Sequence, residues 1–170
     1  MFSLNYNQGD CAVKITVECP EAIIARIKQL SRGAFPKEVY AYLLGTRVNS
    51  TVYVIEDLFL PTDPNRYAKT HKTGSFPDSA FVEGMEAAEE FGGKLIGDFH
   101  SHPYTRKEIL AGRSQQPPIF PDCALSEDDY HPPTWERISA ICLVTETKDG
   151  RLRCRVRFWP VIPLELARSK

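Results

Sequence analysis

The chain has 170 residues, of which 25% are charged and 42% are hydrophobic, and its formal net charge at pH 7 is −1. This is the size and composition of one ordinary globular domain, which folds without a disulfide or a structural metal. The near-neutral charge is unlike that of a dedicated nucleic-acid binder, so we do not expect a nucleic-acid partner. No run approaches the roughly 20 apolar residues that cross a bilayer, and residues 1–10 lack a signal-peptide core. We therefore expect no membrane partner and a cytoplasmic location.

The cysteine pattern agrees with that location. The number of cysteines is odd, and no two of them stand in a Cys-x-x-Cys spacing, which argues against a disulfide framework and favours a reducing compartment. Most of them are expected to be small apolar core residues. They are Cys11, Cys19, Cys123, Cys142 and Cys154.

In chain order, the first half predicts strands around one helix. Residues 12–18 alternate apolar and polar side chains, as a half-buried strand does. Pro20 then begins a helix with an apolar face, and Gly33 is its expected end. Residues 38–45 form an apolar segment with one carboxylate at its start. Residues 51–60, rich in β-branched and aromatic side chains, predict another strand.

The second half begins with a polar loop over residues 61–76 and a helix over residues 77–91. A short strand is predicted over residues 94–99. Residues 103–125 contain four prolines and are expected to form an irregular inserted loop near the active site. Two strands joined by a turn are predicted over residues 138–159. The whole chain, residues 1–170, is thus predicted to be a single mixed α/β domain.

A pair of histidines suggests a metal site. Side chains at positions i and i+2 of a strand point to the same face, so His100 and His102 are expected to converge at a spacing suited to one zinc ion. Seen alone, the pair is equally well explained as two unrelated histidines in a strand-to-loop turn. Their place at the end of a strand favours a functional site.

A second group of polar residues follows at Ser126 and Asp129. Positions i and i+3 of a helix share a face, so both side chains can look into one site. The same spacing is also typical of a helix-start capping box, and that explanation is the stronger one for this motif in isolation. The two explanations are compatible. Asp128 is a rival ligand, but the spacing from Ser126 favours Asp129.

Glu38 completes the candidate site. It stands at the start of a buried apolar segment, where its carboxylate can accept a proton from water and pass it to a leaving amine. Two histidines and an aspartate would fill three positions of a tetrahedral zinc ion and leave the fourth open. Zinc lowers the pKa of bound water to about 7, and the Ser126 hydroxyl is a candidate donor to the oxyanion formed in an attack on a carbonyl.

The three motifs, in this order, resemble those of the JAMM/MPN-plus family of zinc metalloproteases. Glu38 begins Glu-Val-Tyr-Ala-Tyr-Leu-Leu-Gly, which is similar to the family's Glu-x-x-Gly-x-Leu-x-Gly with Ala41 in place of the first glycine. Residues 97–103 resemble its His-x-His-Pro strand, and Ser126 with Asp129 matches its Ser-x-x-Asp. The resemblance covers roughly residues 12–158, which is nearly the whole chain.

The resemblance implies a cytidine-deaminase-like α/β/α sandwich with a mixed sheet flanked by helices. It implies one zinc ion held by His100, His102 and Asp129, with Glu38 as general base and acid and Ser126 steadying the carbonyl oxygen. Active members cut peptide or isopeptide bonds, often at the tail of a ubiquitin-like protein, so we expect a peptide or protein substrate. A non-catalytic zinc-containing binding module and a zinc hydrolase of a small amide stay open as alternatives.

The chain departs from the family at residues 103–125, which form a longer spacer between the histidines and Ser126 than is usual. This spacer is either a lid over the substrate or an inhibitory segment that brings Cys123 or Asp122 to the metal.

A basic face is also predicted in the last strand. Its arginines recur at every second position, which places them on one face. Such a face is either a docking surface for an acidic protein partner or a nucleic acid, or a solvated strand edge whose charge resists aggregation, and the second interpretation is the simpler. The residues are Arg151, Arg153, Arg155 and Arg157.

Overall fold

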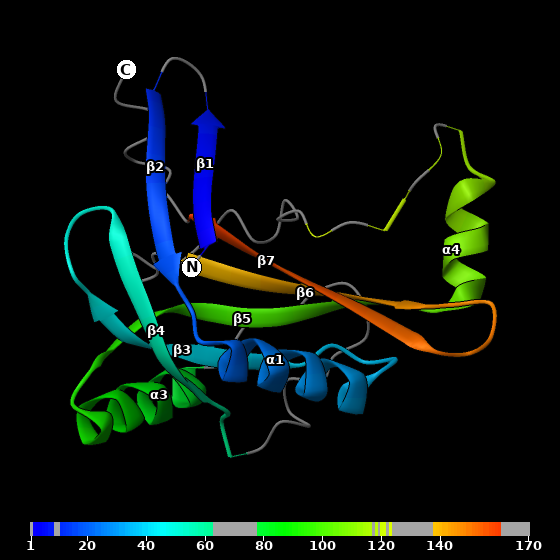
Figure 1. Ribbon diagram of the computed structural model, residues 1–170. Helices are drawn as coiled ribbons and strands as arrows, with labels where there is room; N and C mark the ends of the chain where they lie inside the picture. Colours follow the sequence, from blue (N-terminus) through cyan, green and yellow to red (C-terminus); the bar gives the residue numbers. More distant parts are fainter. Residues whose placement is uncertain are drawn as a thin grey trace.

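Figure 1 shows the chain as a computed structural model, which describes residues 2–8, 11–62, 78–116, 118, 120, 121, 123 and 138–160. Seven strands of this part form one mixed sheet in the order β1-β2-β4-β3-β5-β6-β7. The β2–β4 and β5–β6 pairs are parallel and the other pairs are antiparallel. The strands are β1 (Phe2–Gln8), β2 (Cys11–Glu18), β3 (Tyr40–Arg47), β4 (Val52–Phe59), β5 (Lys94–Tyr104), β6 (Ile138–Glu146) and β7 (Leu152–Pro160).

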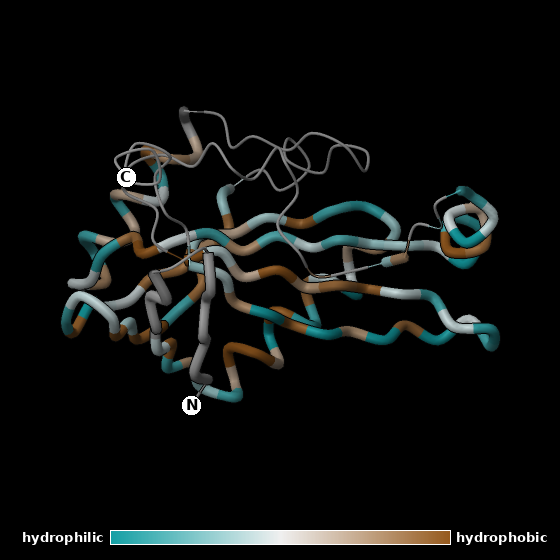
Figure 2. The backbone as a smooth tube through the Cα atoms, turned by 90° about the horizontal axis from the view of Figure 1, so that it is seen from above, coloured by the Kyte–Doolittle hydropathy of each residue, from teal (hydrophilic) through white to brown (hydrophobic). Residues whose placement is uncertain are grey.

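Three helices of the described residues flank the sheet: α1 (Glu21–Ala34), α3 (Asp78–Phe91) and α4 (Arg106–Arg113). The mixed α/β architecture predicted from the sequence is therefore confirmed. Figure 2 shows hydrophobic and hydrophilic residues interspersed along the backbone. No helix of the described part is long and apolar enough to cross a membrane.

Helix α1 covers one face of the sheet. Its apolar stripe includes Ile23 and Ile27, which pack in the main hydrophobic core. The strands contribute Phe99 from β5 and both Ala140 and Cys142 from β6, and all three are fully buried. Because burial of apolar surface is the main favourable term in folding, this face carries most of the stabilising contacts of the central strands.

Helix α3 lies over the other face, against β3. Tyr42 is fully buried in this second core, where it packs with Ala80 and Ala88 of the helix. The approach of the helix requires a glycine, since a Cβ atom at Gly84 would lie 2.7 Å from the Tyr42 ring. Helix α3 leaves the β6 and β7 side of this face to a smaller cluster around Cys123, Ile141 and Leu143.

Two regions differ from the expectations drawn from the sequence. The segment 103–125 is not irregular throughout, because β5 continues to Tyr104 and helix α4 follows. Thr105 and Glu108 form a capping box that satisfies backbone N–H groups at the helix start, and Ile109 is buried beneath the helix. The N-terminal residues, which showed no strand pattern, form β1 because β2 offers them an antiparallel partner along its full length.

Most other elements were predicted to within a few residues. The turn at residues 148–150 is present, and Gly150 adopts the positive φ of 75° that the turn requires. Helix α1 runs one residue past Gly33, to Ala34. Strand β5 reaches further than residue 99 because its parallel pairing with β6 continues to Tyr104, opposite Thr145.

Candidate metal centre

The two histidines of β5 converge as the strand period predicts. The Nε2 atoms of His100 and His102 are 3.1 Å apart, and the two ring centroids are separated by 5.0 Å. A tetrahedral zinc ion with Zn–N bonds of 2.0–2.1 Å needs its two nitrogen ligands about 3.3 Å apart. The pair therefore fits two positions of one zinc ion. His100 is 4% exposed and His102 is half-buried, so the pair opens outward at His102.

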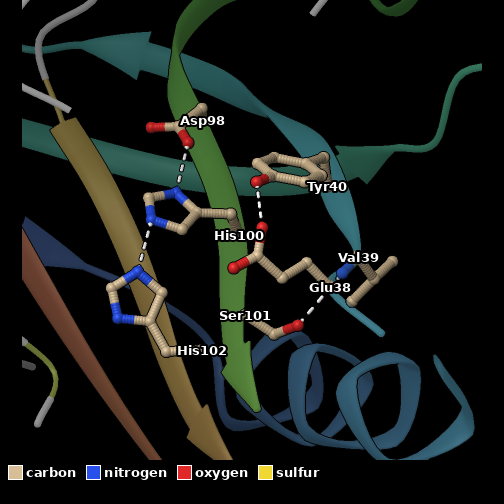
Figure 3. A network of polar contacts seen from close by, with 7 residues as sticks. All are labelled: Glu38, Val39, Tyr40, Asp98, His100, Ser101 and His102. Atoms are coloured by element: carbon tan, nitrogen blue, oxygen red, sulfur yellow. Dashed lines mark hydrogen bonds and ion pairs between the residues drawn. The ribbon is translucent and has the colours of Figure 1, made fainter. Parts of the chain in front are cut away.

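Asp98 orients the inner histidine. Its Oδ2 lies 2.9 Å from Nδ1 of His100, and the carboxylate is itself buried (Figure 3). An ionised carboxylate can only accept a hydrogen bond, so with Asp98 ionised the Nδ1 atom of His100 carries the proton and the Nε2 lone pair faces His102. The sequence analysis missed this residue, although the alternation Asp98, His100, His102 places all three on one strand face.

Glu38 lies on the same side of the sheet as the histidines, just before β3. The hydroxyl of Tyr40 donates to Glu38 Oε2, and the Tyr40 ring stacks on His100 with centroids 5.6 Å apart. Glu38 is 9% exposed, which makes it a buried carboxylate at the edge of the candidate site. Tyr40 therefore links the predicted proton carrier to the predicted ligand, and it too was missed from the sequence.

Backbone contacts hold this arrangement in place. The Val39 N–H donates to Ser101 Oγ at 3.0 Å, and the Ser101 N–H donates to the Val39 carbonyl at 3.0 Å. These two bonds join the start of β3 to the strand residue between the two histidines (Figure 3). The distance between Glu38 and the histidine pair is thus set by the β3–β5 pairing, in which Tyr40 stands opposite His100.

The remaining predicted site residues, Ser126 and Asp129, lie outside the described residues, as do Asp122 and Asp128. Within the described part, no group of three His, Cys, Asp or Glu side chains is arranged to hold a metal ion. The two histidines therefore supply two ligands, and the third ligand stays a prediction.

Cys123, which the sequence analysis considered as a residue that an inhibitory segment could bring to the metal, lies among the described residues. Its side chain is 1% exposed and packs on Ile141 and Leu143 of β6. The thiol donates to the Arg155 carbonyl at 3.4 Å, and the Trp159 indole N–H donates to the Cys123 carbonyl at 2.6 Å. These contacts tie the segment around Cys123 to β7.

Burial makes two cysteines on the α1 side, Cys19 and Cys142, poor nucleophiles. It raises the pKa of the Cys142 thiol from 9.0 to about 12 and that of Cys19 to about 11. At neutral pH both thiols are protonated. Cys142 is fully buried and Cys19 nearly so. We therefore read them as core residues, in agreement with the sequence analysis.

Comparison with known proteins adds a family to this geometry. The described part is a mixed α/β domain with a His-x-His pair on a central strand of its sheet and a buried glutamate beside the pair. The family model described as prokaryotic homologs of the JAB domain matches residues 20–108, a range that includes Glu38, His100 and His102. The chain belongs to this JAB/MPN family, which includes both metal-dependent isopeptidases and non-catalytic members. No match was found among curated protein sequences.

Two solved structures, from Desulfitobacterium hafniense and Salinibacter ruber, agree with this chain at the level of the fold. A Desulfitobacterium hafniense protein is 16% identical with a TM-score of 0.52, and the match covers 86% of this chain and 92% of that one. A Salinibacter ruber protein is 17% identical with a TM-score of 0.50, at 86% and 82% coverage. A JAB1/MPN domain protein from Archaeoglobus fulgidus is 19% identical with a TM-score of 0.43, at 81% and 87% coverage.

Proposed function

We propose that the chain is a zinc-dependent peptidase or isopeptidase that hydrolyses a peptide or isopeptide bond of a protein substrate. The observation that carries the proposal is the 3.1 Å approach of the His100 and His102 Nε2 atoms, with the buried carboxylate of Glu38 linked to His100 through Tyr40. Membership of a family that contains isopeptidases supports the same conclusion. In this proposal Asp129 is the third ligand.

Each site residue has a separate role in the proposed hydrolysis. A bound zinc ion would supply Lewis acidity and bring the pKa of a bound water to about 7. Glu38 accepts the proton of the attacking water and delivers it to the departing amine, and the Tyr40 hydroxyl holds the carboxylate in place. Asp98 fixes the tautomer of His100, and Ser126 donates to the carbonyl oxygen.

The protein substrate is proposed to present an extended tail, such as that of a ubiquitin-like protein, in the cytoplasm. An extended tail is the form in which a scissile bond can reach a half-buried site such as that at His102. Hydrolysis of a small amide would need the same residues but no dependence on a protein tail, so substrate length separates the two activities.

Elemental analysis of zinc tests the ligand set first. The parent protein is expected to contain about one zinc ion per chain after zinc loading. The variants His102→Ala and Asp129→Ala are each expected to lose it. Failure of the parent to retain zinc would overturn the proposal.

Cleavage of a peptide library then tests Glu38. The variant Glu38→Gln keeps an acceptor for the Tyr40 hydroxyl but cannot carry a proton, so it is expected to retain zinc and lose activity by at least about 100-fold. Glu56→Gln on β4, an exposed glutamate that is not among the candidate site residues, is the matched control and is expected to remain active. No cleavage by the zinc-loaded parent would make the chain a non-catalytic member of its family, and cleavage by Glu38→Gln at the rate of the parent would overturn the role of Glu38.

A further inference from the structure

The basic stripe on β7, defined as Arg153, Arg155 and Arg157, lies on the edge of the sheet nearest the histidines. β7 is the last strand in the sheet order (Figure 1). All three arginine side chains are exposed. The residues between them, from Leu152 to Phe158, turn to the α1 face and pack against the main core. The stripe therefore faces away from α1.

Strand register places the stripe in line with the candidate site. Arg157 pairs with Ile141, which pairs with His100. Directly paired residues on neighbouring strands project to the same face. The three paired residues therefore form a row across β5, β6 and β7, with a histidine at one end and an arginine at the other.

The next row has the same form, since Arg155 pairs with Leu143 and Leu143 pairs with His102. Neighbouring strands are about 4.8 Å apart, so the arginine positions lie about 10 Å from the histidine positions across the sheet. An extended chain covers this distance with about three residues.

An apolar ridge separates the two ends of each row. It consists of Cys123, Ile141 and Leu143, with Tyr104 and Trp159 packed against them. The hydrogen bonds from the Cys123 thiol to Arg155 and from Trp159 to Cys123 fasten the ridge to the arginine strand. A molecule that reaches the histidines and the stripe together would cross apolar surface in between.

The described residues do not neutralise the two arginines in line with the histidines. Neither Arg155 nor Arg157 forms an ion pair within the described part of the chain. By contrast, Arg151 pairs with Asp149 in the β6–β7 turn, where hydrogen bonding by Thr147 lowers the pKa of Asp149. The stripe beyond the turn is therefore positive and open to an anionic group.

We propose that Arg153, Arg155 and Arg157 bind an acidic, extended segment of the polypeptide substrate, at least three residues from the bond that is cut. This inference rests on the proposed function for its link to cleavage. The inference requires a substrate with carboxylates on one side of the scissile bond. Between these carboxylates and the bond, the substrate has an apolar stretch that covers the ridge.

The spacing of the stripe favours a polypeptide over a nucleic acid. Arginines at alternate positions of a strand are about 7 Å apart, and carboxylates at alternate positions of an extended peptide repeat at the same distance. Each guanidinium can then meet one carboxylate in a charge-assisted contact. The net charge of −1 for the whole chain is also unlike that of a protein that binds nucleic acid through general electrostatic attraction.

A direct binding measurement tests the stripe without requiring cleavage. The probe is a fluorescein-labelled peptide in which glutamate alternates with serine, and fluorescence anisotropy follows its binding to the zinc-loaded full chain at low salt. Arg155→Glu/Arg157→Glu is expected to bind roughly tenfold more weakly than the parent, because attraction becomes repulsion at two sites. Arg155→Gln/Arg157→Gln, which only removes the charges, is expected to fall between them.

The matched control is Arg32→Glu/Lys94→Glu, which makes the same change in net charge at exposed positions on α1 and at the start of β5. It is expected to bind the peptide as the parent does. An equal loss in the control variant and the stripe variant would overturn the inference, because the effect would then belong to net charge. Tighter binding of single-stranded DNA than of the acidic peptide under the same conditions would overturn it as well.

Cleavage separates this inference from the proposed function. Glutamates placed about three residues from the scissile bond of a cleavable peptide are expected to raise kcat/KM roughly tenfold in the parent and not in Arg155→Glu/Arg157→Glu. Cleavage with no preference for acidic residues would overturn the inference and leave the peptidase intact. Binding of the acidic peptide with no cleavage of any peptide would overturn the proposed function and leave the stripe as a docking surface.

Discussion

The two faces of β5 carry opposite kinds of side chains, although one strand forms both. Phe99 points to the α1 face and is fully buried in the main core. Its neighbours His100 and Asp98 point to the other face, where they hydrogen-bond to one another. β6 repeats the division, with Cys142 on the α1 face and Ile141 on the histidine face.

This division shows how a strand can combine stability with chemistry. Apolar side chains on one face hold the strand in the sheet, and their burial is largely independent of what the alternate residues carry. The polar face can then hold groups whose burial contributes little to stability but fixes their geometry. Changes on the α1 face should therefore act mainly on folding, and changes on the histidine face mainly on the metal.

The largest expected effect comes from Phe99→Ala. Removing the ring leaves a cavity in the main core, and the free energy of unfolding should fall by about 3–5 kcal/mol. His102→Ala, three positions away on the other face and half-buried, should change it by less than about 1 kcal/mol in metal-free protein. Urea unfolding measures both. Similar losses of unfolding free energy in the two variants would show that the two faces of β5 do not differ in their contribution to stability.

The same period explains which parts of the site could be predicted from the sequence. The convergence of His100 and His102 depends only on strand geometry, so the spacing of the two histidines was enough to predict it. Asp98 lies two residues before His100 and therefore on the same strand face, so the same spacing rule could have predicted it. The contact between Tyr40 and His100 depends on the β3–β5 register, and the pairing of strands far apart in the sequence is not encoded in any local pattern.

The fold shows a similar limit. Helices and strands with strong apolar periods, such as residues 77–91 and 138–147, were predicted correctly. Helix α4 was missed because the prolines around it indicated a loop, although Thr105 and Glu108 have the spacing of a capping box. β1 was missed because its seven residues become a strand only through pairing with β2.

A second test sharpens the comparison within the histidine face. Asp98→Asn removes the charge that orients His100, and zinc affinity should fall by about 10–100-fold, measured by competition with a chromophoric chelator. Ser139→Ala is the matched control, because Ser139 stands beside Asp98 in the β5–β6 register and its buried hydroxyl has no hydrogen-bond partner among the described residues. It should leave zinc affinity unchanged. An Asp98→Asn variant with the affinity of the parent would show that His100 needs no such partner.

Alkaline pH tests the α1 face. Because burial raises the pKa of Cys142 from 9.0 to about 12, the unfolded chain loses this proton first as the pH rises. The protonated Cys142 thiol therefore contributes fully to the free energy of unfolding below pH 9. This contribution is lost between pH 9 and about 12, at no more than about 1.4 kcal/mol per pH unit. Cys142→Ala should be less stable at pH 7, yet its free energy of unfolding should fall less steeply above pH 9. Parallel curves for the two proteins would mean that the thiol ionises without unfolding.

The smallest expected effect lies where β5 leaves the sheet. Thr105→Ala removes the side-chain acceptor of the Glu108 N–H at the start of α4, and such a loss costs about 1 kcal/mol. Because Ile109 is the one buried residue of this short helix, the effect should stay local, raising hydrogen exchange of the α4 amides while β5 and β6 amides remain protected. Thr105→Ser keeps the hydroxyl and should behave as the parent. If amides of β5 also exchanged faster in Thr105→Ala, then α4 would be coupled to the strand that carries the histidines, and the segment after His102 would share in holding the site.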